Sequence, residues 1–343
     1  MKAHLIAAVL GLTILAGCDT TRALEGPYGV YVTNEVSGEL TLIDPASNEV
    51  IRTIPLGKRP RGIRVAPDQS RLFVALSGSP ISPPGVDEDS LPPPDRGADG
   101  IGVVEPAGPR LVTILRGPSD PEQTSVSRDG TRLFIANEDK GTASIMDVAT
   151  GRTLAEFEVG GEPEGVTTSP DGRFVYVTSE EDSQVAVIDA AANALITLVK
   201  VGPRPRDTAF TSDSKRAYVT AENGGSISVI DTATHSVIET ITLPGENVRP
   251  MGAVVSPDDR RLYVSTGRGG TVVAIDTQTH QPVGSVAVGT RPWGIALSPD
   301  GSRLYTANGP SNDVTVVDTQ AMSVVTKIPS GGSPWGVAII PRR

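Results

Sequence analysis

The stretch from Arg291 to Asn308 reads RPWGIALSPDGSRLYTAN, and variants of it recur from Val30 to the C-terminus. Small and apolar residues alternate from Gly294 to Leu297, and the SPDG sequence at 298–301 is typical of a tight turn. Apolar, aromatic and β-branched residues follow at Leu304 to Thr306. The stretch therefore predicts a strand, a turn and a second strand, which form one β-hairpin of a repeat.

Two markers fix the length of this repeat. A proline recurs in one slot with spacings of 61, 42, 42, 45, 42 and 42 residues, at Pro60, Pro121, Pro163, Pro205, Pro250, Pro292 and Pro334. An acidic residue at the end of a later strand recurs with spacings of 61, 42, 42, 42, 45 and 42 residues, at Asp44, Glu105, Asp147, Asp189, Asp231, Asp276 and Asp318. A repeat of this length, rich in short strands and turns, is typical of a β-propeller.

The two ends of the repeat array predict how the ring closes. Tyr31 to Asn34 aligns with Tyr305 to Asn308 as the second strand of a blade, whereas Trp335 to Ile340 aligns with an innermost strand. We therefore predict an all-β fold over residues 28–341, a seven-bladed β-propeller of four-stranded antiparallel blades. The C-terminal inner strand joins the three N-terminal strands in one blade, which removes two exposed sheet edges.

The N-terminus has the pattern of an export signal. Lys2 precedes a short apolar run from Leu5 to Ile14, which is too short to span a bilayer stably, and LAGC follows at 15–18. LAGC resembles the lipobox of bacterial lipoproteins, which implies cleavage before Cys18 and acylation of that residue. The alternative is that Cys18, the only cysteine, is a small buried hydrophobe. We expect a signal peptide at 1–17, a tether at 18–27 and a periplasmic protein anchored to a bacterial membrane by lipid.

Charge and composition argue against nucleic acid, metal and cofactor binding. The chain has 30 basic and 40 acidic residues and no run rich in lysine or arginine that would neutralise phosphates. Zinc and haem sites need clustered histidine or cysteine ligands or an axial ligand. His4 lies in the signal, and we expect His235 and His280 to be exposed turn residues. We predict no nucleic acid partner, no metal site and no cofactor.

An insertion of 19 residues relative to the repeat length lies at about 77–99. Its prolines favour extended conformations, and loops of this length inside a compact domain are usually functional or disordered. Its acidic residues either bind calcium or are solvated charges, the reading we favour; they are Asp87, Glu88, Asp89, Asp95 and Asp99. Because strands alternate in direction, we expect the insertion on the face that carries the proline loops.

The residue after each repeat proline varies while its frame is constant. At the entry of the innermost strand, these side chains should ring the mouth of the channel: Arg61, Glu122, Glu164, Arg206, Met251, Trp293 and Trp335. Loops between the second and third strands add Glu35, Glu138, Glu180 and Glu222. Either these residues form a binding site, or Arg61 and Arg206 neutralise the carboxylates and the tryptophans cap the channel. Acidic residues in the other turns fit side-chain-capped turns better than catalytic carboxylates.

The YVTN sequence at 31–34 and the SPDG turns at 169–172 and 298–301 resemble the YVTN family of β-propeller repeats. Five segments resemble more narrowly the subgroup encoded beside pyrroloquinoline-quinone (PQQ)-dependent alcohol oxidation systems: Arg59–Gly62, Asp120–Glu122, Ile135–Asp139, Glu162–Gly165 and Asn308–Asp313. That resemblance implies a periplasmic, non-enzymatic accessory or binding role. Departures from the family pattern are the SRDG turn at 127–130, Glu105 in place of aspartate and the insertion.

Two function classes remain open from the sequence. The first is an exported, lipid-anchored binding or scaffolding propeller that presents its insertion-bearing face to a periplasmic or membrane protein or to a small ligand. The alternative is a hydrolase of the lactonase or lyase type with a Glu/Arg site at the channel mouth. The two differ in whether Arg61, Arg206, Glu122 and Glu164 converge on one empty pocket or pair off along the rim.

Overall fold

The computed structural model describes residues 22–81 and 90–342. The predicted signal peptide at 1–17, the candidate lipidation site Cys18 and the acidic run Asp87, Glu88 and Asp89 lie outside these residues. Among the described helices, none is long and apolar enough to cross a membrane.

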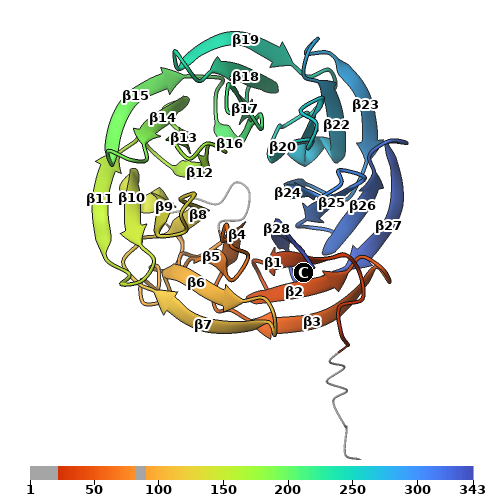
Figure 1. Cartoon of the computed structure of the whole chain (residues 1–343), viewed down its shortest axis with the longest axis horizontal. Coiled ribbons are helices and arrows are strands. Elements are labelled where there is room, and N and C mark those ends of the chain that lie inside the picture. The colour runs from red at the N-terminus through yellow and green to blue at the C-terminus, as the bar shows by residue number, and fades with distance from the viewer. Residues whose placement is uncertain (1–21, 82–89, 343) are drawn as a thin grey trace, which may run out of the picture.

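In the described residues, 28 strands form seven four-stranded antiparallel sheets, arranged as blades in a ring (Figure 1). Blade 1, from the channel outward, contains β28 (Pro334–Pro341), β1 (Tyr28–Asn34), β2 (Glu39–Asp44) and β3 (Glu49–Pro55). Blades 2 to 4 contain β4 (Pro60–Val65), β5 (Leu72–Leu76), β6 (Gly100–Glu105) and β7 (Arg110–Leu115); β8 (Pro121–Val126), β9 (Arg132–Asn137), β10 (Thr142–Asp147) and β11 (Thr153–Glu158); and β12 (Pro163–Thr168), β13 (Phe174–Ser179), β14 (Gln184–Asp189) and β15 (Ala194–Lys200). Blades 5 to 7 contain β16 (Pro205–Phe210), β17 (Arg216–Ala221), β18 (Ser226–Asp231) and β19 (Ser236–Thr242); β20 (Ala253–Val255), β21 (Arg261–Ser265), β22 (Thr271–Asp276) and β23 (Pro282–Ala287); and β24 (Pro292–Leu297), β25 (Arg303–Asn308), β26 (Asp313–Asp318) and β27 (Ser323–Pro329). Short 3₁₀ turns are η2 (Glu138–Lys140) and η3 (Gly267–Gly269).

The predicted fold and the predicted closure are confirmed. β28 pairs with β1 in antiparallel register, with Val30 opposite Ile339 and Val32 opposite Val337. Both strands contribute side chains to apolar clusters on each side of blade 1. The ring therefore closes through a complete four-stranded blade whose strands come from opposite ends of the chain.

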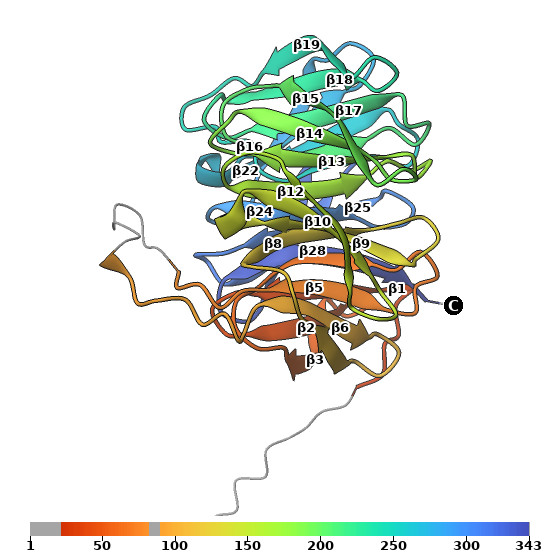
Figure 2. The ribbon, with the colours of Figure 1, turned by 90° about the vertical axis from the view of Figure 1, so that its left-hand side faces the viewer.

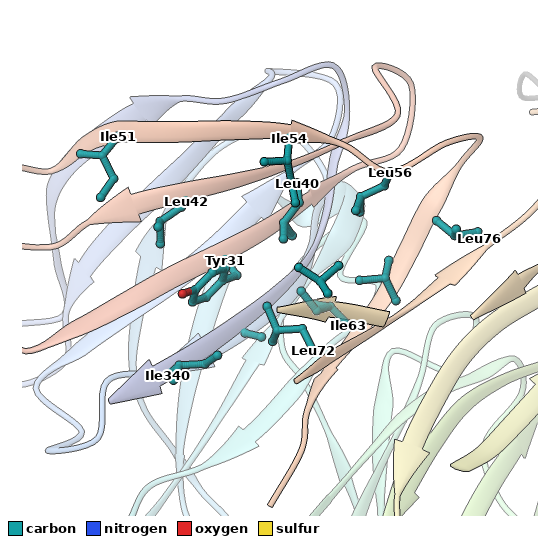
Figure 3. Close-up of a cluster of buried hydrophobic side chains, with 13 residues drawn as sticks. Tyr31, Leu40, Leu42, Ile51, Ile54, Leu56, Ile63, Leu72, Leu76 and Ile340 are labelled. Carbon is teal, nitrogen blue, oxygen red and sulfur yellow. The ribbon is translucent and has the colours of Figure 1, made fainter. Parts of the chain in front are cut away.

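Each pair of neighbouring blades buries one apolar cluster between its sheets. The second strand of each blade places an aromatic residue in the seams at the same position of the repeat. These residues are Tyr31, Phe73, Phe134, Tyr176, Tyr218, Tyr263 and Tyr305. Figure 3 shows the cluster between blades 1 and 2, where Leu40 and Leu72 pack with Ile63 beside Tyr31. Seven thin cores of this kind stabilise the ring through nearest-neighbour contacts, as in other repeat architectures.

The recurring aspartates cap turns, as predicted. In blade 2 the slot holds Glu105, which pairs with Arg110 at 2.6 Å. Asp318 Oδ1 accepts hydrogen bonds from the backbone N–H groups of Gln320 at 3.1 Å and Ala321 at 2.9 Å. In the turn between the first two strands of blade 3, hydrogen bonds from Ser127 and Thr131 lower the pKa of Asp129 to about 2. These carboxylates accept hydrogen bonds from backbone N–H groups of the turns in which they lie.

The expectation that His235 and His280 are exposed was wrong. Both occupy the predicted turn slot, but their rings pack against the preceding blade. His235 Nδ1 lies 2.9 Å from the Tyr176 hydroxyl, and the His235 ring is edge-on to Phe174. The side chain of His280 is 15% exposed. A left-handed backbone in this slot turns the side chain inward, so the histidines close the ends of two seams.

The two faces of the disc carry different segments. The described flanks of the insertion extend from one face, whereas the C-terminus leaves from the other (Figure 2). The first described residues also lie on the C-terminal side, because Arg342 Nη1 donates to the carbonyl of Glu25 at 3.0 Å. The face of the insertion is also the face of the proline loops, as the strand directions predict.

Candidate functional site

The residue after each repeat proline lies at the start of an innermost strand or, in blade 6, just before it. In blade 7 the register shifts between Pro292 and Ile295, so Trp293 and Gly294 form an irregularity in the strand. A Cβ built at Gly294 would lie only 2.5 Å from the carbonyl oxygen of Trp335 in the next blade. Glycine is required there by this close approach. The approach brings the variable side chains of successive blades together at one end of the channel.

Hydroxyl groups on the second strands hold these residues in place. Thr33 Oγ1 donates to the carbonyl of Arg61 at 2.7 Å, across the seam between blades 1 and 2. Thr220 Oγ1 donates to the carbonyl of Met251 at 2.6 Å, across the seam between blades 5 and 6. Because both bonds go to the backbone, the side chain in the slot is free to differ between repeats.

The residue before each proline is a second element of the mouth. Six of these residues have a left-handed backbone, with φ between 38° and 56°: Arg59, Asp120, Glu162, Arg204, Arg291 and Ser333. A non-glycine residue in this region costs roughly 1–2 kcal/mol, and the following proline restricts it further. The strained loops aim several charged side chains at the mouth.

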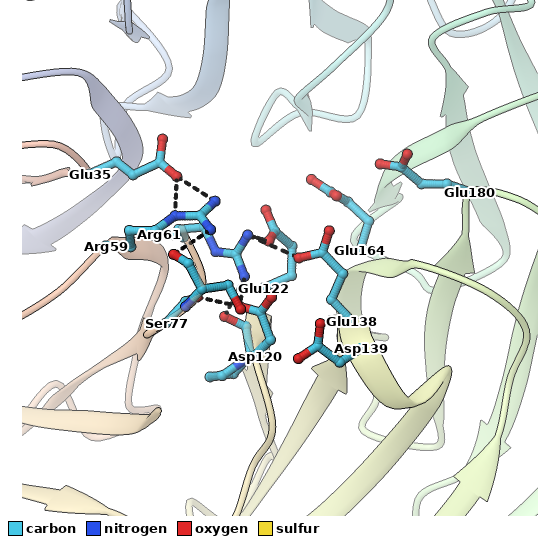
Figure 4. Close-up of polar contacts among 12 residues, drawn as sticks. Glu35, Arg59, Arg61, Ser77, Asp120, Glu122, Glu138, Asp139, Glu164 and Glu180 are labelled. Atoms are coloured by element: carbon cyan, nitrogen blue, oxygen red, sulfur yellow. Dashed lines mark hydrogen bonds and ion pairs between the residues drawn. The ribbon is translucent and has the colours of Figure 1, made fainter. Parts of the chain in front are cut away.

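Arg61 is the centre of the first charged cluster (Figure 4). Its guanidinium forms ion pairs with Glu122, with Asp120 at 2.8 Å and with Glu138 at 3.0 Å. The side chains of Arg61 and Glu122 are 3% and 4% exposed. Arg59 lies beside this group and pairs with Glu35 at 2.9 Å. All the carboxylates that hold Arg61 come from blade 3.

Arg206 is the centre of the second cluster. It pairs with Glu164 at 2.8 Å, with Glu222 at 2.6 Å and with Glu180. Arg204 adds a second guanidinium, 2.6 Å from Glu180 and 3.2 Å from Glu222. Two arginines therefore meet three acidic side chains, so the arginines do not match the carboxyl groups one to one.

The pKa values follow from burial and from the crowding of carboxylates. Burial, together with the neighbouring Glu164, raises the pKa of Glu180 to about 10 despite the arginines. Burial and the nearby Glu164 and Glu138 also raise the pKa of Glu122 well above its usual range, although Arg61 opposes the shift. Burial likewise raises the pKa of Glu222, but Arg206 and Arg204 outweigh it, so this carboxyl titrates below its usual range. Glu180 therefore holds a proton at neutral pH while Glu222 is ionised.

The other half of the mouth is aromatic and apolar. The rings of Trp293 and Trp335 lie 5.5 Å apart, at 32° to each other. The guanidinium groups of Arg206 and Arg291 lie 5.2 Å and 5.1 Å from the centre of the Trp293 ring. Met251 is buried below them. Both tryptophans and Met251 line the waist of the channel, where only about 40 Å³ is open.

Above this waist lies a cavity of about 1000 Å³. Its described lining includes both tryptophans, nine acidic residues and seven basic residues, together with Pro80 and Pro92 to Pro94 of the insertion. Below the waist, the channel widens again to about 550 Å³. The tryptophan pair therefore separates the channel into two compartments, and the insertion borders the charged one.

The insertion is tied to the mouth by specific contacts at both ends. Arg59 Nη1 donates to the carbonyls of Ser79 at 3.0 Å and Pro80 at 3.1 Å. On the other flank, Arg96 pairs with Asp139 and, at 3.3 Å, with Asp99. These contacts make the described flanks of the insertion part of the cavity wall.

The sequence left open whether the charged residues of the mouth converge on one pocket or form ion pairs along its rim. Arg61 pairs with Glu122 and Arg206 with Glu164, so these four residues pair off, yet all of them line the same cavity. Of the remaining candidates, Met251 lies deeper, at the waist. The arginines therefore neutralise the acidic side chains, as one of the two predicted alternatives has it, and the paired groups line an open cavity. Among the described residues, no group of three or more His, Cys, Asp or Glu side chains could hold a metal ion.

Sequence reasoning missed the residues that precede the prolines. Arg59, Asp120, Arg204 and Arg291 all line the mouth or bind residues that do. The signal was present in the sequence, because this slot is charged in most repeats and varies as the following slot does. It was hidden because the residue before proline normally adopts an extended backbone.

Two family models match the chain. The model described as "Choice-of-anchor I domain" matches residues 31–209, and the model described as "YNCE-like beta-propeller" matches residues 171–342. No curated protein sequence matches the chain at a significant level.

Solved structures from several bacteria share the fold. The periplasmic gluconolactonase PpgL from Pseudomonas aeruginosa is 23% identical, with a TM-score of 0.72 over 91% of this chain and 99% of that chain. A putative 6-phosphogluconolactonase from Bacteroides fragilis is 18% identical, with a TM-score of 0.73 over 93% of this chain and 99% of that chain. Kuenenia stuttgartiensis hydrazine synthase is 19% identical, with a TM-score of 0.69 over 82% of this chain and 95% of that chain. At these identities the likeness concerns the fold alone.

Proposed function

Because the chain belongs to the YNCE-like beta-propeller family, we propose that it is an exported, lipid-anchored binding propeller that recognises a ligand or a partner segment at the mouth of its channel. The observation that carries this proposal is the pairing of the mouth arginines. Arg61 and Arg206 are buried and each contacts three acidic side chains, so these polar groups are fixed before any ligand arrives. Fixed polar groups around a cavity lower the ordering cost of binding.

The charge of the cavity favours a ligand group that is cationic. Acidic residues outnumber basic ones in its described lining, and the arginines of both clusters are already engaged. Glu162 and Glu181 lie on the open rim and form none of the ion pairs found among the described residues. An amine or guanidinium entering the cavity meets these carboxylates and the Trp293 ring, to which cations are also attracted.

The location and the tether are parts of the proposal that rest on the sequence. The LAGC motif supports acylation at Cys18 and attachment to a bacterial membrane from the periplasmic side. On the resemblance to the PQQ-associated subgroup, we extend the proposal to an accessory role beside a PQQ-dependent alcohol oxidation system. Cys18→Ser is expected to move the protein from the membrane fraction to the soluble fraction after export, because a lipid chain is the only anchor the proposal provides. Retention of the variant by washed membranes would contradict the anchor.

The mouth is tested by a pull-down from detergent-solubilised membranes with two charge variants. We expect Glu162→Lys with Glu181→Lys to lose the captured partner, because the substitutions replace rim carboxylates with like charges for a cationic group. The matched control reverses the same charge on the outer strand β11, at Glu156 and Glu158, and should retain capture. Equal capture by both variants would contradict recognition at the mouth.

The insertion is tested by a deletion that keeps the backbone contact at its base but removes the two carbonyls that Arg59 binds. The N–H of Asp95 donates to the carbonyl of Gly78 at 2.9 Å, so residues 79–94 can be replaced by two glycines while Gly78 and Asp95 keep their contact. Ser77 and Asp99, which bind Asp120, remain in place. We expect this variant to fold and to bind the partner more weakly, because it lacks one wall of the cavity.

A second candidate function is hydrolysis of a lactone or a related ester. The protonated Glu180 lies with Glu164 beside Arg206, and a buried carboxyl group whose pKa is raised toward neutral pH or above is typical of acid–base sites. Of the structures that share the fold, one is described as a periplasmic gluconolactonase and another as a putative 6-phosphogluconolactonase. Hydrolysis of glucono-δ-lactone by the purified protein, lost in Glu180→Gln and kept in Glu181→Gln, would support this function. No hydrolysis above the rate in buffer would exclude this substrate.

A further inference from the structure

The seam between blades 1 and 2 differs from the other seams at the face opposite the mouth. Each turn between a third and a fourth strand has a slot four residues after its recurring acidic residue. In six of the seven turns, all of them described, this residue has a left-handed backbone: Asn48, Gly151, Asn193, His235, His280 and Met322. In blade 2 the slot holds Pro109, and the proline ring fixes a negative φ. The turn of blade 2 therefore cannot adopt the shape of the other six.

In three other seams a histidine or a methionine in this slot covers the end of the apolar core. His235 bonds to Tyr176, and Met322 packs against the cluster that contains Tyr263. At the blade 1 seam, the hydroxyl of Tyr31 donates to the backbone carbonyl of Pro106 in this turn at 3.2 Å. A Cβ built at Gly108 would meet no atom within 4 Å. Pro109 thus leaves open an end of the core that a histidine or methionine closes elsewhere.

A pocket of about 540 Å³ lies at this open end. Its apolar lining includes Leu24, Tyr31, Leu42, Ile51 and Ile340. Figure 3 shows the last four of these side chains at one end of the seam cluster. The volume falls within the range of about 300–1,000 Å³ that is typical of small-molecule sites, and the lining is of the expected apolar kind.

Three arginines border this apolar pocket, and they are Arg22, Arg52 and Arg342. Arg22 pairs with Glu49 at 2.5 Å, whereas Arg342 donates to the backbone carbonyl of Glu25. The side chain of Arg52 forms no hydrogen bond or ion pair among the described residues. The corresponding residue in blade 5 is Glu239, which lies 2.6 Å from His280 Nδ1. The guanidinium of Arg52 is therefore available to an oxyanion at the rim.

We propose that this seam pocket binds a single-chain anionic amphiphile, a molecule with an aliphatic tail and a terminal oxyanion. The tail occupies the space beside Tyr31, Leu42 and Ile51. The oxyanion lies at the rim, where Arg52 donates hydrogen bonds to it in the forked geometry that suits carboxylate and phosphate. The site is separate from the mouth and does not depend on recognition there.

Dodecanoate is the probe, measured by calorimetry below its micellar concentration with the chain from residue 18 onward carrying Cys18→Ser. Dodecanoate should bind with one site per chain, whereas dodecanol and dodecyltrimethylammonium bind at least about tenfold more weakly, because they lack the oxyanion. Arg52→Glu should weaken dodecanoate binding by a similar factor. Arg152→Glu makes the same charge change at an exposed position on the same face and should leave binding unchanged.

Pro109→His tests the shape of the site independently of charge. It places in the slot the residue that closes the Tyr176 and Tyr218 seams, and we expect it to abolish dodecanoate binding without lowering the melting temperature. Equal binding of dodecanoate and dodecyltrimethylammonium, or unchanged binding in folded Arg52→Glu, would overturn the proposal. Binding to phosphatidylglycerol vesicles with no binding of dodecanoate would also overturn it, because that result requires surface charge alone. If Arg52→Glu does not fold, Arg52→Gln replaces it with the same expected direction.

Discussion

Four consecutive blades place a charged residue after the repeat proline, in the order Arg61, Glu122, Glu164 and Arg206, whereas the next three place Met251, Trp293 and Trp335 there. Both halves use the same backbone frame. The charged half is held together by buried ion pairs, and the apolar half by ring contact and burial. One repeat frame can therefore carry two unlike surfaces, because the hydrogen bonds that hold it go to the backbone of the variable residue.

The order of charges around the ring also sets the direction in which each arginine reaches. All three acidic side chains that pair with Arg61 belong to the following blade. Two of the three acidic side chains that contact Arg206 belong to the preceding blade. Glu122 and Glu164 therefore meet between the arginines, where burial and the neighbouring Glu164 raise the electrostatic cost of ionising Glu122. The charged half therefore contains a carboxyl group, Glu180, that keeps its proton at neutral pH, whereas the slot residues of the apolar half carry no titratable group.

The largest expected effect is on the apolar half. Trp293→Ala with Trp335→Ala should lower the free energy of unfolding by about 5 kcal/mol or more, because truncating one buried tryptophan costs about 3–5 kcal/mol and Trp293 is half-buried. Urea unfolding followed by circular dichroism measures the loss. Ile238→Ala, on the outer strand and 51% exposed, is the control. A variant that unfolds like the parent and loses only its membrane partner would make the pair a recognition surface instead of a channel plug.

The next effect is on the charged half. Arg206→Met puts into this slot the side chain that Met251 places in the next blade, and it leaves Glu164 and Glu222 short of their main counter-charge. We expect a loss of about 3–5 kcal/mol in urea unfolding at pH 7, as for other buried ion pairs that lose one partner. Adding Glu164→Gln should recover part of the loss. A change below about 1 kcal/mol would show that Arg204 alone neutralises the cluster.

The proton on Glu180 predicts a pH dependence. Its pKa is about 10 in the folded protein and near 4.5 in the unfolded chain, so between these values the folded state holds a proton that the unfolded state has lost. The contribution is complete below pH 4.5 and decreases as pH rises toward 10. Between pH 5.5 and 8.5 we expect the stability of Glu180→Gln to depend less steeply on pH than that of the parent. Glu181→Gln, at the exposed neighbour, should keep the parent slope.

The smallest effect is expected where the two halves touch. Arg291→Gln removes a guanidinium 5.1 Å from the Trp293 ring and should cost less than about 1 kcal/mol of stability, as partly exposed cation–π contacts do. Because the chain has only two tryptophans, a shift in their fluorescence reports directly on this contact. An unchanged emission spectrum would mean that Arg291 does not lie over the ring in solution.

Much of the candidate site could be predicted, but its pairing could not. The repeat frame placed Arg61, Glu122, Glu164 and Arg206 at one mouth because all four occupy the same slot. The repeat frame does not predict that Glu180 keeps its proton at neutral pH, because the pKa of this group depends on its burial and on the charged groups around it. Nor does it show that Asp120 turns toward Arg61, because its left-handed backbone precedes a proline.

The sequence by itself determined the blade number, the closure of blade 1 and the face of the insertion, since periodicity and strand direction follow from residue spacing alone. Only the tertiary structure decided which half of the mouth is rigidly ion-paired and which narrows the channel. It also decided that His235 and His280 face inward and that Pro109 leaves a seam open. Spacing fixes which residues share a slot, whereas side-chain contacts across seams depend on the close approach of blades that are distant in sequence.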